Sequence, residues 1–514
     1  MRAAITSSWA AKFRIGGYNL AFLALFAASG YAQINFDLPN HDISWLLIAA
    51  GRLADGGNYA ADFFEVNPPL ILLIYMPAVL ASRLIEIDLY VALVLLVLTY
   101  IGLSLSAMRM MARRLCPDSG IARPVFQLAA GAVLLFTPGY DFGQREHLIV
   151  IFTLPYLVLV SASRPDRTLG SGASVAAIGW AAFGLFLKPM YVLLPISVTV
   201  ARSVERRSLR ALLSLDLFVF GILGSLYLAL TAVLFPEYFT VASYAARYYP
   251  AFKGLPDANT IAIGTTILVI GACLPAFVAL RMVRDVAESR IATLLALSAI
   301  VSGAAAFLQG KGWSYHFLPI RIFGSVAAVI VIIALARSAA RANGGRLSAG
   351  AFMLVLGVLV GGTMLSSVRN DRAKVQQYTI GQDAMDVMEG RRVFAVSRHV
   401  TAGLPWVPLS GGEWASRFSC LWLLPSYAML LADESVSTEE KEGLAADMRG
   451  FMVEDFEHYR PEIVLIDRNL DAEIGFNALE FYLADDNFKN LWQEYKYFGI
   501  SNNISIYIHK GVSL

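Results

Sequence analysis

Long apolar stretches separated by short polar segments follow one another along most of the chain. A helix needs about 20 apolar residues to cross the hydrocarbon core of a bilayer. The pattern predicts about eleven transmembrane helices, the first at 15–33 and the last at 349–366. Beyond Val368 no comparably long apolar run occurs. We therefore expect a polytopic α-helical membrane domain at 1–368, followed by a soluble domain at 369–514.

The segment between the first two expected spans, about 34–87, does not have the pattern of a single helix. It contains an amphipathic stretch, HDISWLLIAAGRLADGG, and a short apolar stretch broken by Pro77, EVNPPLILLIYMPAVLASR. Amphipathic helices lie in the interface between bilayer and water. We expect an external loop that carries two helices near the membrane surface.

Lysine and arginine residues predict which loops lie in the cytoplasm, because short cytoplasmic loops are rich in them. When the spans are counted in order, five strongly basic loops fall on the same side as the basic N-terminus; they lie near 109–114, 164–167, 202–210, 281–290 and 337–346. The N-terminus is therefore expected in the cytoplasm, and the 34–87 loop and the tail outside. A signal peptide cleaved near Ala32 is an alternative for the first span and leaves the loop on the same side.

The tail has a different composition from the rest of the chain, with more charge and only short apolar runs. RRVFAVSR and PEIVLIDRN are apolar segments flanked by polar residues, which is typical of buried strands. TEEKEGLAADMRGFMVEDFEHY has the spacing of an amphipathic helix. We expect a small external α/β domain.

Composition excludes several classes of protein. Of all residues, 57% are hydrophobic and 16% charged, whereas soluble domains have about a quarter charged. A net charge of +2 without a basic tail gives no sign of nucleic-acid binding. Cys116, Cys273 and Cys420 lie far apart, in no metal or redox spacing. Only Cys420 is expected outside, so we predict no intramolecular disulfide and three small buried apolar side chains.

Ionisable groups near a membrane are costly and therefore mark functional sites, and here they gather in the external loops. The first cluster, Asn40-His41-Asp42, opens the first amphipathic helix. Helix capping by Asn40 or Asp42 is the purely structural alternative. The functional interpretation is a carboxylate that accepts a proton from an acceptor hydroxyl. We place His41 and Glu65 of the same loop near the acceptor.

A second cluster, DFGQREH, opens the fourth expected span. Solubility hardly explains four ionisable residues within seven between two spans, although a structural ion-pair network is an alternative. Arg145 is suited to bind a phosphate bidentately. Asp141 or Glu146 is suited to orient an acceptor or assist the base, and His147 is a further candidate at the acceptor.

Two more cationic positions lie in external loops. Lys311, Tyr315 and His316 belong to KGWSYH, which suits an anionic lipid headgroup, although aromatic side chains also serve as simple membrane anchors. Lys188 precedes Pro189 at the end of the fifth span, where a lysine that merely extends to the interface is the alternative. Cations beside carboxylates at a membrane surface favour an external cavity for a lipid phosphate.

The order and placement of these segments resemble the C-type membrane glycosyltransferases, which include protein O-mannosyltransferases and lipid A aminoarabinose transferases. HDISWLLIAAGRLADGGNYAADFFEVNPPL is similar to their first external loop, where an acidic residue precedes an amphipathic helix and a Pro-Pro-Leu segment. Here these are Asp42 and 68–70. Asp141 matches an acidic residue of the second external loop, and KGWSYHFLP resembles a late Lys-aromatic-Leu-Pro segment. The resemblance covers about 15–335.

Two positions depart from the family pattern. Ile43 follows Asp42 where many members have a second acid, and Asn67 stands where many lipid A–type members have a lysine before Pro-Pro-Leu. The role of that lysine therefore falls to Arg145, Lys188 or Lys311.

The resemblance implies a polyprenyl-phosphate-linked sugar donor, inversion at the anomeric carbon, and a glycan, lipid or protein acceptor of the cell envelope. Compact loops and a composition rich in Ala and Arg favour a bacterial origin. With the topology above, we expect a multi-pass protein of the bacterial inner membrane, with a cytoplasmic N-terminus and a periplasmic C-terminal domain. The carboxylates expected in catalysis are Asp42, Asp141 and Glu146. The groups expected to hold the departing lipid phosphate and stabilise its charge are Arg145, Lys188, Lys311, Tyr315 and His316.

Two other functions stay open at this stage. A glycan polymerase or ligase would use a lipid-pyrophosphate-linked donor, but Asp42 followed by Pro-Pro-Leu favours the monosaccharide transferase. A transporter would place charges near the bilayer midplane and show internal repeats, whereas here the charges gather at one face. Neutral histidines and carboxylates suit a divalent ion, but no ligand spacing indicates one.

Overall fold

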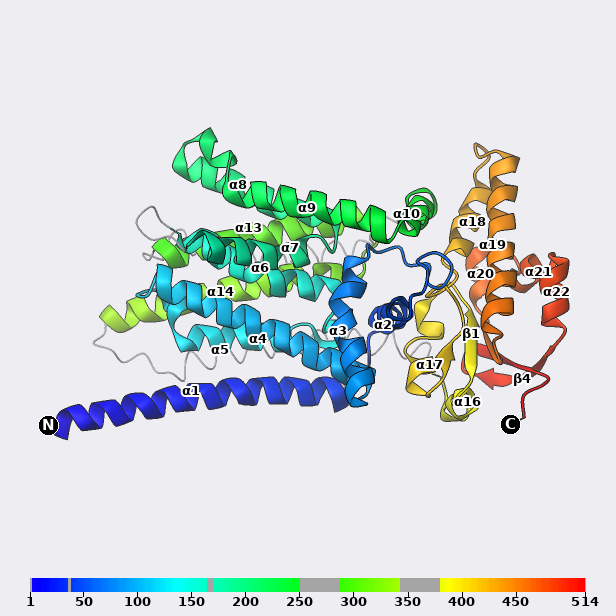
Figure 1. Cartoon of the computed structure of the whole chain (residues 1–514), viewed down its shortest axis with the longest axis horizontal. Helices are drawn as coiled ribbons and strands as arrows, with labels where there is room; N and C mark the ends of the chain where they lie inside the picture. Colours follow the sequence, from blue (N-terminus) through cyan, green and yellow to red (C-terminus); the bar gives the residue numbers. More distant parts are fainter. Residues whose placement is uncertain (1, 36–37, 164–169, 250–285, 343–379, 514) are drawn as a thin grey trace. The chain divides into compact units, whose positions relative to one another are not determined.

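The structure is a computed structural model that describes residues 2–35, 38–163, 170–249, 286–342 and 380–513 (Figure 1). The eighth and eleventh expected spans, and Cys273, lie outside these residues. The chain divides into two compact units. The helical unit comprises Met1–Leu38, Ile85–Ala229 and Leu255–Arg369, and the mixed unit comprises Pro39–Leu84, Leu230–Gly254 and Asn370–Leu514.

Long apolar helices make up the helical unit. In chain order its main helices are α1 (Arg2–Asn35), α4 (Leu89–Leu115), α5 (Pro124–Phe136), α6 (Arg145–Ala162), α7 (Ser171–Leu185), α8 (Leu193–Arg206), α9 (Leu215–Leu234), α13 (Val286–Gln309) and α14 (Leu318–Ala342). Short 3-10 turns connect several of them, among them η2 (Gly139–Asp141), η3 (Pro189–Val192) and η7 (Ser314–Phe317).

Within the described ranges, five stretches are long and apolar enough to cross a membrane. They are α4, α6, α9, most of α13, and the stretch Ser314–Arg337, which comprises η7 and most of α14. The expected polytopic helical character is confirmed, whereas the total of eleven spans stays a prediction. The expected first span is part of the continuous helix α1.

Helix α6 is the central helix of this unit, because it packs against α4, α7, α13 and α14. In the apolar stretch of α6, 94% of the residues are buried inside the protein, compared with 11% in the apolar stretch of α9. Polar groups are costly in lipid but tolerated inside a helix bundle. The charged residues at the start of α6 are therefore shielded from lipid by neighbouring helices.

The two helices expected in the 34–87 loop are both present in the mixed unit. Helix α2 spans His41–Ala54, and α3 spans Leu70–Ile85. The expectation that Pro77 breaks the second helix is wrong, since α3 continues through it. Proline removes a single backbone hydrogen bond, and the flanking Tyr75 and Ala78 are buried, which holds the helix together.

A five-stranded sheet forms the core of the tail. Its strands are β1 (Arg392–Val396), β2 (Glu413–Trp414), β3 (Ile463–Asp467), β4 (Tyr495–Ser501) and β5 (Ile504–His509). The order is β2-β1-β3-β5-β4, in which β1 is parallel to β2 and β3, while β5 is antiparallel to β3 and β4. Strand β1 is buried on both faces, as parallel strands usually are. The two strands predicted from sequence are β1 and β3.

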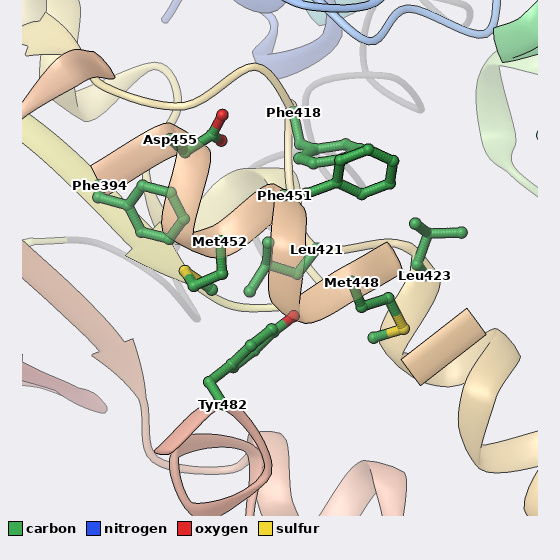
Figure 2. A pocket seen from close by; sticks show the side chains of 9 residues that line it. All are labelled: Phe394, Phe418, Leu421, Leu423, Met448, Phe451, Met452, Asp455 and Tyr482. Carbon is green, nitrogen blue, oxygen red and sulfur yellow. The ribbon is translucent and has the colours of Figure 1, made fainter. Parts of the chain in front are cut away.

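Helix α19 (Thr438–Tyr459) is the amphipathic helix predicted from sequence, and the Ser437 side chain caps it. Figure 2 shows its side chains Met448 and Met452 with Phe394 of β1 around a small apolar cavity. The other helices of the tail are α16 (Gln382–Met388), α17 (Trp406–Leu409), α18 (Leu423–Ala432), α20 (Leu470–Ile474), α21 (Ala478–Leu483) and α22 (Asp486–Trp492). The small α/β composition of the tail is confirmed, while its independence as a domain stays a prediction.

Helix α10 (Glu237–Tyr248) also belongs to the mixed unit and is bonded to the tail. The Tyr244 hydroxyl donates to the Asp447 carboxylate at 2.5 Å, and Arg247 pairs with Glu440 at 2.8 Å. Three segments that are distant in sequence therefore form this unit. Cys116 and Cys420 are buried free thiols, as expected.

Candidate functional site

Helix α6 begins with buried charged residues. The Gln144 side chain caps the helix by accepting from the Arg145 backbone N–H at 3.2 Å. Glu146 is fully buried, and its carboxylate accepts a hydrogen bond from the Lys188 ammonium. Lys188 lies just before η3 and also donates to the side-chain oxygen of Gln309 at 2.9 Å. One expected carboxylate and one expected cation therefore form a buried ion pair.

Two expected aromatic residues complete this cluster. The His316 Nε2 atom lies 4.0 Å from the Glu146 carboxylate. The Tyr315 ring packs edge-on against the His316 ring at 4.5 Å, and the Lys188 ammonium lies 5.5 Å from the Tyr315 ring centre. Residues from three separate loops thus meet around Glu146.

The positive charges of Lys188, Lys311 and Arg145 all act electrostatically on His316. Lys311 lies 4.6 Å from the Trp313 ring centre. Its flanking glycines have φ values of 64° and 65°, a backbone conformation that side chains disfavour, so the tight turn that presents Lys311 requires glycine on both sides. All three expected cations therefore influence the same histidine.

His147 and Asp141 belong to the turn that precedes α6. Asp141 is buried and ends η2. The Gly143 N–H donates to His147 Nδ1 at 3.0 Å, and His147 Nε2 lies 2.9 Å from the Leu134 carbonyl oxygen. Because Nδ1 accepts, Nε2 carries the proton and donates to that oxygen. Both ring nitrogens are therefore engaged by the backbone, so His147 fixes the turn that carries Asp141.

The first-loop cluster belongs to the mixed unit. The Asn40 side chain accepts hydrogen bonds from the backbone N–H groups of Asp42 at 2.9 Å and Ile43 at 3.4 Å. Asn40 is therefore the cap of α2, which decides between the two capping candidates. The Asp42 side chain is 22% exposed and lies 3.7 Å from His41 Nε2. Because Asn40 caps the helix, the Asp42 carboxylate is not needed for that role.

Glu65 is buried and connects two parts of the same loop through hydrogen bonds. Its carboxylate accepts from the Trp45 indole N–H, from the Asn67 backbone N–H at 2.6 Å and from the Asn67 side-chain amide. Asn67 stands at the position where we expected a lysine from the resemblance to many lipid A–type members. Here the amide at that position satisfies the buried carboxylate, so this residue supports the loop.

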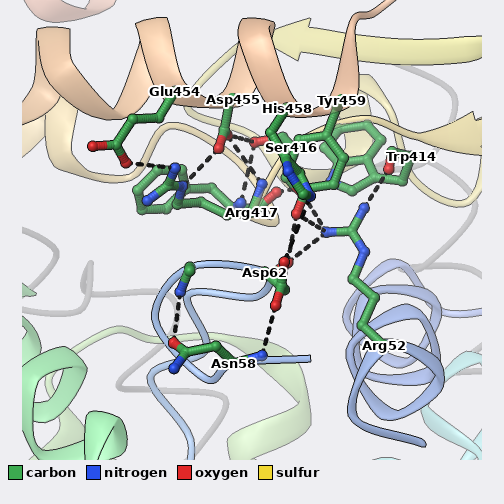
Figure 3. A network of polar contacts seen from close by, with 12 residues as sticks. Arg52, Asn58, Asp62, Trp414, Ser416, Arg417, Glu454, Asp455, His458 and Tyr459 are labelled. Carbon is green, nitrogen blue, oxygen red and sulfur yellow. Dashed lines mark hydrogen bonds and ion pairs between the residues drawn. The ribbon is translucent and has the colours of Figure 1, made fainter. Parts of the chain in front are cut away.

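A network that the sequence did not reveal ties the loop to the tail (Figure 3). The Arg52 guanidinium of α2 donates to the carbonyl oxygens of Asp62 at 2.8 Å and Ser416 at 2.7 Å, and to that of Trp414. It also lies 4.6 Å from the ring centre of Tyr459, whose hydroxyl donates to the Asp62 carbonyl oxygen at 2.8 Å. Arg52 thus joins both sides of the loop to the tail.

A buried ion pair lies beside this network. Arg417 Nε donates to Asp455 at 2.6 Å, and the backbone N–H of Arg417 and the hydroxyl of Ser416 donate to the second Asp455 oxygen. Burial raises the pKa of the Asp455 carboxyl, and the Arg417 charge opposes this rise. The Arg417 carbonyl oxygen accepts from the Phe64 N–H at 2.6 Å, so the ion pair also positions the loop.

The expected site residues fall into two groups. The groups in the helical unit are Asp141, Arg145, Glu146, His147, Lys188, Lys311, Tyr315 and His316, and those in the mixed unit are His41, Asp42 and Glu65. Sequence reasoning missed Gln309, Arg52 and Asp455. In the described part of the chain, no group of three or more His, Cys, Asp or Glu side chains is arranged to hold a metal ion.

No family model and no curated protein matches the chain in sequence. Among solved structures, ArnT from Cupriavidus metallidurans bound to undecaprenyl phosphate is similar at a TM-score of 0.52 and 13% identity, over 96% of this chain and 98% of that chain. The apo form of the same ArnT gives 0.42 at 12% identity over the same shares. The archaeal oligosaccharyltransferase AglB from Archaeoglobus fulgidus, in complex with an inhibitory peptide and a dolichol-phosphate, gives 0.45 at 10% identity over 98% and 75%. The likeness to the first of these structures, over nearly all of both chains, shows that this chain has a similar fold, which agrees with the expectation drawn from the resemblance of its loops.

Proposed function

We propose that this protein is a membrane glycosyltransferase that transfers a sugar from a polyprenyl-phosphate-linked donor to a cell-envelope acceptor at the external face of a bacterial inner membrane. The observation that carries the proposal is the buried cluster in which Lys188 and His316 contact Glu146, with the charges of Arg145 and Lys311 acting on it, in a chain whose fold is similar to that of ArnT. The ArnT structure holds undecaprenyl phosphate, a lipid of the class that the cluster suits.

The cluster is suited to bind a phosphate because its three cations outnumber Glu146, the carboxylate with which Lys188 and His316 are in contact. Hydrogen bonds between a cation and a phosphate are about twice as strong as those between neutral groups. Since Glu146 is fully buried and bonded to Lys188, its proposed role is to position that ammonium. A direct catalytic role of Glu146, which its sequence position indicated, stays a prediction.

The proposed chemistry is a single displacement. The Asp42 carboxylate accepts the proton of an acceptor hydroxyl while the acceptor oxygen forms a bond to the anomeric carbon. The bond between that carbon and the phosphate oxygen breaks on the opposite side, which inverts the configuration. The polyprenyl phosphate departs with the electron pair, and the cations stabilise its growing charge. Asp141 is proposed to hold the acceptor.

Binding of the shared leaving group tests this proposal without knowledge of the sugar. We expect purified full-length protein in nanodiscs to bind radiolabelled polyprenyl phosphate, and Lys188→Gln to weaken binding by about 10-fold or more, the effect of one hydrogen bond to a charged group. The matched control is Arg83→Gln, which removes a half-exposed cation outside the cluster. Equal binding by both variants would refute the phosphate site, and binding of polyprenyl pyrophosphate alone would favour the polymerase or ligase.

A further inference from the structure

A cavity with polar lining residues lies at the far end of α5 from the candidate site. It is lined by residues of α1, α4 and α5, which pack against one another, and has a volume of about 80 Å³. This volume is several times the roughly 10–15 Å³ that holds one water molecule, so the cavity has room for a small polar group. Helix α5 has 13 residues, so its length of about 20 Å separates the cavity from the turn with Asp141.

Two polar side chains that line this cavity have atoms without a protein partner. The Nε atom of Arg109 and the side-chain oxygen of Gln127 are buried and make no hydrogen bond within the described ranges. Gln127 is only 4% exposed, and its amide nitrogen donates to the Ile121 carbonyl at 3.4 Å, which aligns the side chain. Buried polar groups are nearly always paired, so each unpaired atom offers a hydrogen-bonding position to a water molecule or a ligand in the cavity.

The donors and acceptors define the chemistry of that ligand. Arg109 offers N–H donors in a planar fork, which fits a phosphate. The Gln127 oxygen needs a hydrogen-bond donor, and Tyr18, Asn19 and Ser106 add polar groups to the cavity wall. Phe22 and Leu105 provide an apolar side to the same cavity. A ligand with a phosphate, a hydroxyl and an apolar part satisfies all of these groups.

The expected topology places this end of α4 at the cytoplasmic surface, together with the exposed Arg113 and Arg114. Anionic lipids are concentrated in the cytoplasmic leaflet, and basic pockets between transmembrane helices on that side bind their headgroups. We infer that the cavity between α1, α4 and α5 binds an anionic phospholipid with a hydroxyl-bearing headgroup, with its phosphate on Arg109 and its hydroxyl on Gln127.

The test uses delipidated full-length protein and native mass spectrometry. We expect the first phosphatidylglycerol to bind about 10-fold or more tightly than phosphatidylcholine, which has a phosphate but no donor for Gln127. Arg109→Gln should abolish this preference and Gln127→Leu should reduce it. The matched control, Arg113→Gln, removes an exposed charge from the same helix end and should retain the preference.

Several outcomes would overturn the inference. They are an equal loss in Arg109→Gln and Arg113→Gln, an equal affinity for phosphatidylethanolamine, or competition by glycerol phosphate, which would indicate a soluble ligand. Arg109→Lys guards against a folding defect, because it keeps the charge and loses only the planar fork. It should bind phosphatidylglycerol with an affinity between those of the wild type and Arg109→Gln.

Discussion

Replacing Asp42 by asparagine separates the two roles that its position allows. Asn40 already caps α2, so the new amide at position 42 changes no cap. Asparagine has nearly the same shape as aspartate, but it cannot accept a proton at neutral pH. The substitution therefore removes the proposed base and leaves the helix start intact.

The two roles differ in expected magnitude. A carboxylate in the first turn of a helix contributes about 0.3–1 kcal/mol to stability through the helix dipole. The Asp42 side chain is only 22% exposed, so solvent screens its charge little, which favours the upper part of this range. A general base contributes about 10²–10⁴-fold in rate, which corresponds to about 3–5 kcal/mol in the barrier. The effect on transfer should thus exceed the effect on stability several-fold.

The assay compares sugar transfer, binding of polyprenyl phosphate and thermal unfolding for the same protein preparation. We expect Asp42→Asn to lower transfer by about 10²–10⁴-fold while binding of the lipid phosphate and the melting temperature stay close to wild type. Asp55→Asn is the matched control, since it removes an exposed carboxylate at the other end of α2. Near-normal transfer by Asp42→Asn would refute the base assignment and shift the role to Asp141.

Three further perturbations follow from the burial of charged groups and of a thiol. Glu146→Gln leaves the buried ammonium of Lys188 without its charge partner and should cost about 3–5 kcal/mol of stability, measured by thermal unfolding. The double variant Glu146→Gln/Lys188→Met should regain stability, because no unpaired charge stays buried, but it should not regain sugar transfer. Arg52→Ala removes hydrogen bonds to three carbonyl groups and should destabilise the mixed unit by about 2 kcal/mol or more, with faster proteolysis of the loop. The control Arg83→Ala removes an exposed ion pair and should change stability by no more than about 1 kcal/mol. Burial raises the pKa of Cys420 to about 12, so iodoacetamide at about pH 8.5 should label this thiol only after unfolding, and rapid labelling of the folded protein would contradict its burial.

Local patterns in the sequence predicted the elements whose apolar spacing is regular. The run of four consecutive apolar residues in β1 is such a pattern. The helical spacing of apolar residues along the 22 residues of α19 is another. The β4–β5 hairpin was missed because most of β4 is exposed or half-exposed and shows no clear alternation. The passage of α3 through Pro77 was missed because packing, rather than local preference, holds that helix.

The candidate site was predictable only in part, and for a physical reason. Counting spans places Glu146, Lys188 and His316 on one side of the membrane, which makes their meeting possible. No periodic signal marks Gln309 as the second partner of Lys188, because one polar residue at a helix end has many possible roles. Likewise, nothing local connects Arg52 with the carbonyl groups of residues 414 and 416.

The network around Arg52 has a consequence for biosynthesis. Arg52 and Tyr459 are 407 positions apart. At a synthesis rate of about 5–20 residues per second, the loop waits about 20–80 s after its own synthesis for its partner to be made. During this interval its buried aromatic and charged groups lack the surface that later covers them. A nascent chain stalled before the tail would therefore expose an incomplete loop, which makes this segment a natural target for membrane chaperones and proteases.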